Sequence, residues 1–86
     1  MTLNEIQYSL TILDMSFNSV RDMSPVSCCG ELRELYLAQN KLRKIQGIRH
    51  MKHLKILDLG ANRIRVKKSY HLLYNITILY SWKNKI

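Results

Sequence analysis

Four asparagines recur at a fixed interval of 22 residues, at positions 18, 40, 62 and 84. Each belongs to the same apolar pattern, which is clearest from Leu32 to Leu42 and reads L-x-x-L-x-L-x-x-N-x-L. The other three copies begin at Leu10, Leu54 and Ile76 and align with it without a gap. A fixed period of roughly 20–50 residues indicates a repeat architecture. We therefore expect stacked 22-residue coils, each contacting only its neighbours.

The apolar positions inside one repeat predict a short strand followed by a tight outer turn. Leu35 and Leu37 are separated by one residue, so both face the interior of the coil while Tyr36 faces the opposite way. Parallel pairing of such strands from successive repeats builds an inner, concave wall. The apolar residues that follow recur at every third position: Leu42, Ile45, Ile48 and Met51. That spacing suits a helical or irregular turn that closes the outer, convex wall, so the predicted fold is an α/β solenoid.

Each repeated asparagine is predicted to have a structural role. Its amide both donates and accepts, so it can satisfy backbone groups where the chain leaves the strand. We divide the chain into a leader or partial cap at 1–9 and repeats at 10–31, 32–53, 54–75 and, incomplete, 76–86. The fourth repeat has Ser81 in place of a core leucine, and no outer turn follows Ile86. Solenoids normally need end caps, so we expect a fragment, a truncated form or a degenerate copy of a longer protein.

The composition excludes several classes of protein. With 47% hydrophobic and 23% charged residues, the chain is too apolar to be disordered. No run approaches the roughly 18 apolar residues of a membrane span, and the N-terminus lacks the features of a signal peptide, so we expect a cytoplasmic or nuclear protein. The two cysteines, Cys28 and Cys29, are adjacent, and we expect reduced thiols, with Cys29 packed, and no zinc site. The sequence shows no nucleotide-binding or catalytic fingerprint, and we predict no cofactor or metal.

The residues that the repeat leaves free on the concave wall form an alternating row. Between the two inward positions of each repeat stand, in order, Asp14, Tyr36, Asp58 and Tyr80. Glu34 and Trp82 are each two residues from a tyrosine of this row and are predicted to share its face. Tyrosine and tryptophan on a rigid wall are favoured in protein contacts. We call these six residues the acidic–aromatic strip and predict that it binds a protein; the alternative is an ordinary solvated sheet face.

The positive charge is concentrated in one part of the chain. The net charge is +8, and the segment from Lys41 to Lys68 holds ten Lys or Arg and a single acid. The predicted edge after the strands carries Arg21, Arg43 and Arg65, with Lys41, Arg63 and Lys85 beside the asparagines. Such charge allows a nucleic acid, a membrane surface or an acidic protein as a partner. Single-strand nucleic-acid sites interleave aromatic with basic residues, and here the two lie on different faces, so we favour a solvated edge.

The repeat pattern as a whole resembles a known family. The segments LTILDMSFN, LRELYLAQN and LKILDLGAN, with NKLRKIQGIRHMKHL between the last two, are similar to 22-residue leucine-rich repeats. The resemblance covers roughly residues 8–86 and is to the subfamily typified by a regulatory subunit of protein phosphatase 1. It implies a leucine-rich-repeat horseshoe segment, with short parallel strands on the concave face and helical or irregular turns on the convex face. This chain departs from the subfamily in being short and basic.

The resemblance also implies a function without catalysis. In that subfamily the concave face is implied to bind the phosphatase catalytic subunit through alternating acidic and aromatic residues, which match Asp14, Tyr36, Asp58 and Tyr80 here. We therefore expect a monomeric, non-enzymatic regulatory subunit, or a fragment of one, that binds the protein phosphatase 1 catalytic subunit. Two alternatives stay open. One is a scaffold in an RNA–protein (spliceosomal) complex, which the basic segment favours, and the other is a scaffold in a ciliary or cytoskeletal complex.

Overall fold

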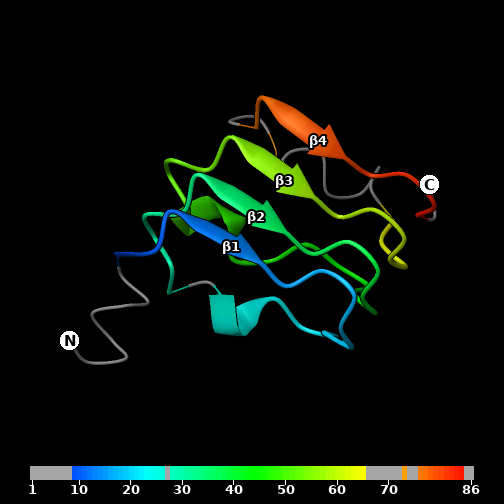
Figure 1. The fold of residues 1–86 in the computed structure, drawn as a ribbon. Helices are drawn as coiled ribbons and strands as arrows, with labels where there is room; N and C mark the ends of the chain where they lie inside the picture. The colour runs from blue at the N-terminus through cyan, green and yellow to red at the C-terminus, as the bar shows by residue number, and fades with distance from the viewer. Residues whose placement is uncertain (1–8, 27, 66–72, 74–75, 85–86) are drawn as a thin grey trace.

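The computed structural model describes residues 9–26, 28–65, 73 and 76–84. Four short strands form one sheet: β1 (Ile12–Asp14), β2 (Glu34–Tyr36), β3 (Ile56–Asp58) and β4 (Ile78–Tyr80). They lie side by side in chain order and run in the same direction (Figure 1). This parallel sheet confirms the predicted solenoid. Most of the predicted leader, and the basic residue Lys85, lie outside the described residues.

The register of the sheet reproduces the 22-residue period. Partner positions across the three strand pairs are held by Leu13, Leu35, Leu57 and Leu79. Because side chains alternate across a strand, this row faces the interior, and the residues on either side of it face the concave surface. Each repeat is stacked on the next without a shift, so residues 22 positions apart on the strands lie about 5 Å from each other.

Two short 3-10 helices lie on the outer wall: η1 (Ser24–Val26) and η2 (Ile48–His50). A 3-10 helix has about three residues per turn, so apolar residues three apart fall on one edge. This explains why Ile45, Ile48 and Met51 are all buried. The predicted tight outer turn is therefore present in the second repeat. Gly47, the N-cap residue just before η2, has φ 79°, a left-handed conformation that glycine adopts without steric cost.

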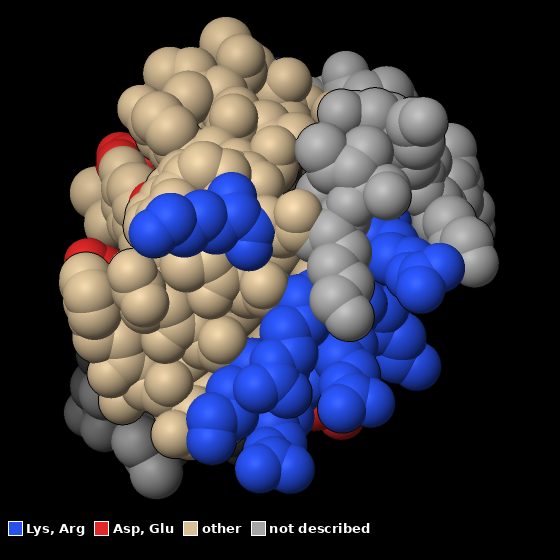
Figure 2. All heavy atoms as spheres, turned by 90° about the vertical axis from the view of Figure 1, so that its right-hand side faces the viewer, with Lys and Arg blue, Asp and Glu red and all other residues tan. Residues whose placement is uncertain are grey.

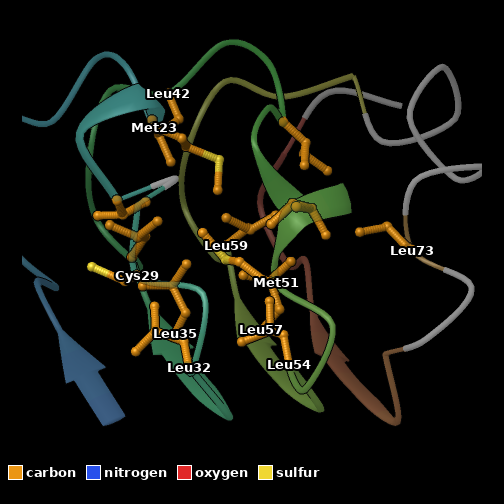
Figure 3. Close-up of a cluster of buried hydrophobic side chains, with 14 of the residues drawn as sticks. Met23, Cys29, Leu32, Leu35, Leu42, Met51, Leu54, Leu57, Leu59 and Leu73 are labelled. Atoms are coloured by element: carbon orange, nitrogen blue, oxygen red, sulfur yellow. The ribbon is translucent and has the colours of Figure 1, made fainter. Parts of the chain in front are cut away.

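The hydrophobic core fills the space between the sheet and the outer turns. Figure 3 shows side chains from both, among them Leu57 and Met51, directed into this space. Leu35 and Leu57, on the two central strands, are fully buried, whereas the equivalent leucines on β1 and β4 are only partly buried. Burying a leucine contributes roughly 1.5–3 kcal/mol. Within the described part of the chain, the two middle repeats therefore contribute most of the apolar stabilisation.

The asparagines join each repeat to the one before it. The Asn62 amide nitrogen donates to the carbonyl oxygen of Leu59 in its own repeat (3.0 Å) and of Leu37 in the preceding repeat (2.9 Å). Its side-chain oxygen accepts the backbone N–H of Leu42 at 3.0 Å. Equivalent bonds are made by Asn40 and Asn84. These bonds confirm the predicted structural role.

The residue before each asparagine adopts a left-handed backbone conformation although none is glycine. The four are Phe17, Gln39, Ala61 and Lys83, with φ between 53° and 61°. Such a conformation costs a non-glycine residue roughly 1–2 kcal/mol. The backbone N–H of Gln39 donates to Gly60 in the next repeat at 2.8 Å, and Ala61 donates to Trp82 in the same way. The inter-repeat bonds therefore hold the turn in a shape that the residue itself disfavours.

The two adjacent cysteines lie in the first repeat. Both cysteines are free thiols, and Cys29 is buried, as predicted. Cys28, which the sequence predicts to be exposed, is half-buried. Burial, followed by the proximity of Cys28, raises the pKa of the Cys29 thiol.

Within residues 9–26, 28–65, 73 and 76–84, no helix has the length and apolar character needed to cross a membrane.

Replacing Asn62 with alanine is expected to destabilise the fold by at least about 2 kcal/mol, because buried backbone groups of two repeats lose their partner. Asn18→Ala is the matched control. Asn18 is exposed and bonds only to Met15 and Ser16 in its own turn, so its loss should cost less than about 1 kcal/mol. Urea unfolding followed by circular dichroism measures both, and equal losses would contradict the inter-repeat role.

Candidate protein-binding face

The concave face of the sheet carries the predicted alternating row in one continuous register. Asp14 on β1 is the partner of Tyr36 on β2, and Asp58 on β3 is the partner of Tyr80 on β4. Tyr36 and Asp58 are partners across the two central strands. Tyr80 is 47% exposed, whereas Tyr36 and Asp58 are half-buried because a strand flanks them on each side. The structure thus brings these four residues together, about 5 Å from strand to strand.

The concave face carries a second row of residues. The sequence prediction included only one of them, Glu34. Two positions before the alternating row, the partners are Ile12, Glu34, Ile56 and Ile78. Ile12 and Ile78 leave 55% and 41% of their surface exposed. The signal was present in the sequence, because the period of two that places Glu34 beside Tyr36 places an isoleucine beside each other member. The concave face therefore offers aliphatic as well as acidic and aromatic surface.

The two aspartates also stabilise the turns that follow their strands. Oδ1 of Asp14 accepts the backbone N–H of Ser16 at 2.9 Å, and Oδ1 of Asp58 accepts that of Gly60 at 3.0 Å. Each bond reaches the residue two positions on, which is the pattern of an Asx turn. The backbone bond from Ser16, supported by the Ser16 side chain, lowers the pKa of Asp14. Each carboxylate therefore has a structural role besides its charge.

Glu34 and Tyr36 are joined by a hydrogen bond on the concave side of β2. The Tyr36 hydroxyl donates to Oε1 of Glu34 at 2.5 Å. This bond, followed by desolvation and by the negative charge of Glu34, raises the pKa of Tyr36 to about 12. Because the bond restrains the ring, less side-chain entropy is lost when a partner packs against it.

Trp82 packs over the backbone of the preceding repeat. A β-carbon added at Gly60 would overlap the indole ring, so the glycine leaves the space that the ring occupies. Gly60 is the turn residue whose N–H donates to Asp58, so the ring lies over the turn that follows β3. The Lys83 ammonium lies 5.6 Å from the ring centre, within the range of a cation–π contact. The ring stays 46% exposed and adds to the aromatic surface near Tyr80.

The arrangement is suited to contact with a macromolecule. Its exposed groups are rings, aliphatic side chains and carboxylates on a parallel sheet. Asp14 and Asp58 are separated by the intervening strand, about 10 Å apart, which is too far to act on one substrate atom. Over the described ranges, no group of three or more His, Cys, Asp or Glu is placed to hold a metal ion.

The stacked coils, the inward leucine row and the asparagine bonds together define a leucine-rich-repeat solenoid. The family description "Leucine Rich Repeat" matches residues 9–30, and "Leucine Rich repeats (2 copies)" matches residues 30–69. The chain belongs to the leucine-rich-repeat family.

Two curated proteins show which members of the family the chain is similar to. It is 35% identical over 78 residues to the protein phosphatase 1 regulatory inhibitor subunit PPP1R7 homolog of Arabidopsis thaliana, which is 90% of this chain and 24% of that protein. It is 36% identical over 74 residues to cilia- and flagella-associated protein 410 of Mus musculus, which is 83% of this chain and 29% of that protein. The chain thus spans about a quarter of the length of these relatives. The first similarity confirms the predicted resemblance to leucine-rich-repeat proteins of the PPP1R7 type.

A solved structure with the same fold comes from a bacterial protein. An internalin from Listeria monocytogenes superimposes with a TM-score of 0.70 over 99% of this chain and 32% of the internalin chain. The sequence identity is 19%, so this similarity concerns the fold alone.

Gly60→Ala is expected to move the Trp82 ring from the backbone into solvent without unfolding the chain, because the displaced group is the exposed end of a side chain. Trp82 is the single tryptophan, so its fluorescence emission should shift to longer wavelength. Gly30→Ala is the control, since a β-carbon there would lie 3.8 Å from the His50 carbonyl oxygen, an ordinary contact. An unchanged emission in Gly60→Ala would show that the ring does not lie over Gly60.

Glu34→Gln is expected to lower the pKa of Tyr36 from about 12 toward the ordinary value of 10.0. Because the folded-state pKa is raised, the stabilisation from this bond is fully present below pH 10 and is lost as the pH rises toward 12. Ultraviolet absorbance of tyrosinate measures the titration, and Tyr36→Phe identifies the signal among the five tyrosines. The interpretation is wrong if Tyr36 titrates at the same pH with and without the Glu34 carboxylate.

Proposed function

We propose that this chain is a non-catalytic protein-binding module that binds the catalytic subunit of protein phosphatase 1 through its concave face. The main support is the alternating row Asp14, Tyr36, Asp58 and Tyr80, held in register on four parallel strands. A second support is the similarity, over 90% of the chain, to a protein named as a protein phosphatase 1 regulatory inhibitor subunit homolog. The chain corresponds to 24% of that protein, so the proposal concerns one segment of a binding surface.

The physical basis is that each member of the row contributes a different kind of contact. Tyr80 and Trp82 are about half exposed and offer rigid aromatic area, the type of surface that dominates protein interfaces. Tyr36 is restrained by Glu34 before any partner arrives. Asp58 carries a charge at the centre of the face, where desolvation by a partner strengthens its attraction to a basic or hydrogen-bonding group.

The test of this proposal removes charge and aromatic area from the concave face and checks separately that each variant still folds. The double variant Asp58→Asn/Tyr36→Ala removes the central carboxylate charge and the central ring, while the Asn oxygen can still accept the N–H of Gly60. Its matched control is Glu31→Gln/Phe17→Ala, which removes one acid and one aromatic ring from exposed positions outside the sheet. Binding of the purified phosphatase catalytic subunit is measured by surface plasmon resonance, with circular dichroism of each variant to check folding.

We expect the concave variant to raise the Kd at least about tenfold and the control to change it less than about twofold, since a few central residues carry most of the binding energy. Tyr36→Phe alone should change the Kd little, because it keeps the ring and loses only the bond to Glu34. Equal Kd values for the concave variant and the control would count against this face, and no saturable binding by the unaltered chain would count against this partner.

A second candidate function is a scaffold in a ciliary complex, and one observation favours it. The similarity to cilia- and flagella-associated protein 410 has nearly the same identity and covers 83% of the chain. Both functions use a leucine-rich-repeat surface to bind protein, so the fold does not separate them. The phosphatase measurement does, because a ciliary scaffold predicts no saturable binding to the phosphatase catalytic subunit.

A further inference from the structure

The edge toward which the four strands run carries a concentrated positive charge. Figure 2 shows this side of the molecule, where Lys and Arg form a contiguous band across the lower part of the face. The exposed cations that follow the strands include Arg21, Lys41, Arg43, Arg63 and Arg65. This edge is distinct from the concave face, because its residues come from the turns and not from the sheet.

Four of these cations surround one hollow of about 350 Å³, which is lined by Arg21, Lys41, Arg43 and Arg63. They belong to three successive repeats and stand in two rows, with Arg21 and Arg43 in one row, and Lys41 and Arg63 in the other. The backbone of the rows is fixed, because the N–H of Lys41 donates to Val20 and that of Arg63 to Leu42 in the preceding repeat. The hollow is therefore a preformed feature of the coil stacking.

The cations of the hollow are not neutralised by any described carboxylate. Within the part of the chain that the structure describes, none of the four makes an ion pair. The acid beside them in the chain, Asp22, is engaged elsewhere, since Oδ1 accepts the N–H of Ser24 at 2.8 Å and the amide of Gln46 at 2.7 Å. Like charges held on adjacent coils repel one another, and low-dielectric walls concentrate their field on the hollow. A bound anion would relieve this repulsion.

We propose that the basic hollow binds a phosphate monoester carried by a protein, such as a phosphoserine or phosphothreonine. A phosphate monoester carries about −1.5 to −2 charges and three acceptor oxygens, which suits several convergent cations. Three of the four are arginines, whose planar fork binds phosphate oxygens in pairs. The volume of about 350 Å³ lies near the lower end of the roughly 300–1,000 Å³ of small-molecule sites, so it fits one such group.

A nucleic acid fits these observations less well. Binding to single-stranded nucleic acid combines a basic track with aromatic rings on which bases stack. Of the described rings, Tyr36 and Tyr80 lie on the strands, whereas Phe17 and Trp82 lie in the turns that follow β1 and β4. None of these rings lines the hollow in the described part of the chain. Phosphodiesters also carry one charge each, whereas here four cations converge on one space.

This site goes beyond the proposed phosphatase contact and does not depend on it. Arg43 and Arg63 are on turns that follow β2 and β3, whereas Tyr36 and Asp58 are on the strands themselves. Loss of one interaction therefore leaves the residues of the other in place. The concave and the edge variants can be measured in parallel on the same protein, so failure of one proposal is distinguishable from failure of the other.

The test measures binding of a fluorescent serine–glycine–alanine peptide that carries one phosphoserine, by fluorescence anisotropy. Peptides with serine or aspartate at that position, and a polyuridine RNA, serve as competitors. The double variant Arg43→Gln/Arg63→Gln removes two cations of the hollow. Lys52→Gln/Lys55→Gln is the matched control, since it removes the same charge from exposed residues that precede β3 at the opposite end of the strand. All four positions are exposed, so both variants should fold, which circular dichroism checks.

The expected result is a loss of about tenfold or more in phosphopeptide affinity for the arginine variant and less than about twofold for the lysine control, because only the former removes charge-assisted bonds. The serine and aspartate peptides should compete at least about tenfold more weakly than the phosphopeptide. Equal losses in the two variants would reduce the effect to net charge and overturn the proposal. Equal competition by the aspartate peptide would also overturn it, and so would stronger competition by RNA.

Discussion

The two-sided hydrogen bonding of the buried asparagines is the interaction on which the structure depends. Asn62 bonds to backbone groups of its own repeat and of the one before it, so it fixes both the shape of a turn and the distance between turns. A buried amide in this place must be satisfied on both sides, because an unpaired buried polar group costs about 1–3 kcal/mol. Asn40 repeats the bonds 22 residues earlier. The constant spacing of the sheet follows from this repetition.

Constant spacing converts a linear period into two surfaces. Residues on the strands line up as Asp14, Tyr36, Asp58 and Tyr80, and residues seven positions further on line up as Arg21, Arg43 and Arg65. No contact between members of a row is needed to bring them together, because the backbone ladder already does so. The left-handed residues before each asparagine are part of the same constraint. Ala61 keeps a φ of 53° because its N–H is bonded across to the next repeat.

The sequence could predict whatever the period dictates. The parallel strands, the inward leucines, the asparagine role and the alternating row all follow from residues recurring 22 apart, and the fold class is confirmed. The period does not determine which side chains bond to or pack on their neighbours. The Asx bond from Gly60 to Asp58 and the bond from Tyr36 to Glu34 depend on rotamers within a single repeat, and the packing of Trp82 on Gly60 depends on the rotamer of one side chain between two repeats. The exposed isoleucines were also predictable from the period of two. The sequence prediction omitted them because it considered only the acidic and aromatic residues of this face.

The concave face and the basic hollow carry charges of opposite sign, and this affects how binding at one can influence binding at the other. Asp14, Glu34 and Asp58 lie on the strands and the cations of the hollow lie on the turns, so a partner attracted by Asp58 carries charge of the sign that the basic hollow repels. Exposed charges are screened over about 8 Å at physiological ionic strength, which limits this coupling to groups close to both surfaces. Electrostatics is therefore a route by which one ligand can affect the other. Linkage then requires the effect to be reciprocal: a basic partner on the concave face that strengthens anion binding at the edge is itself bound more tightly when the anion is present, and added salt weakens both effects together.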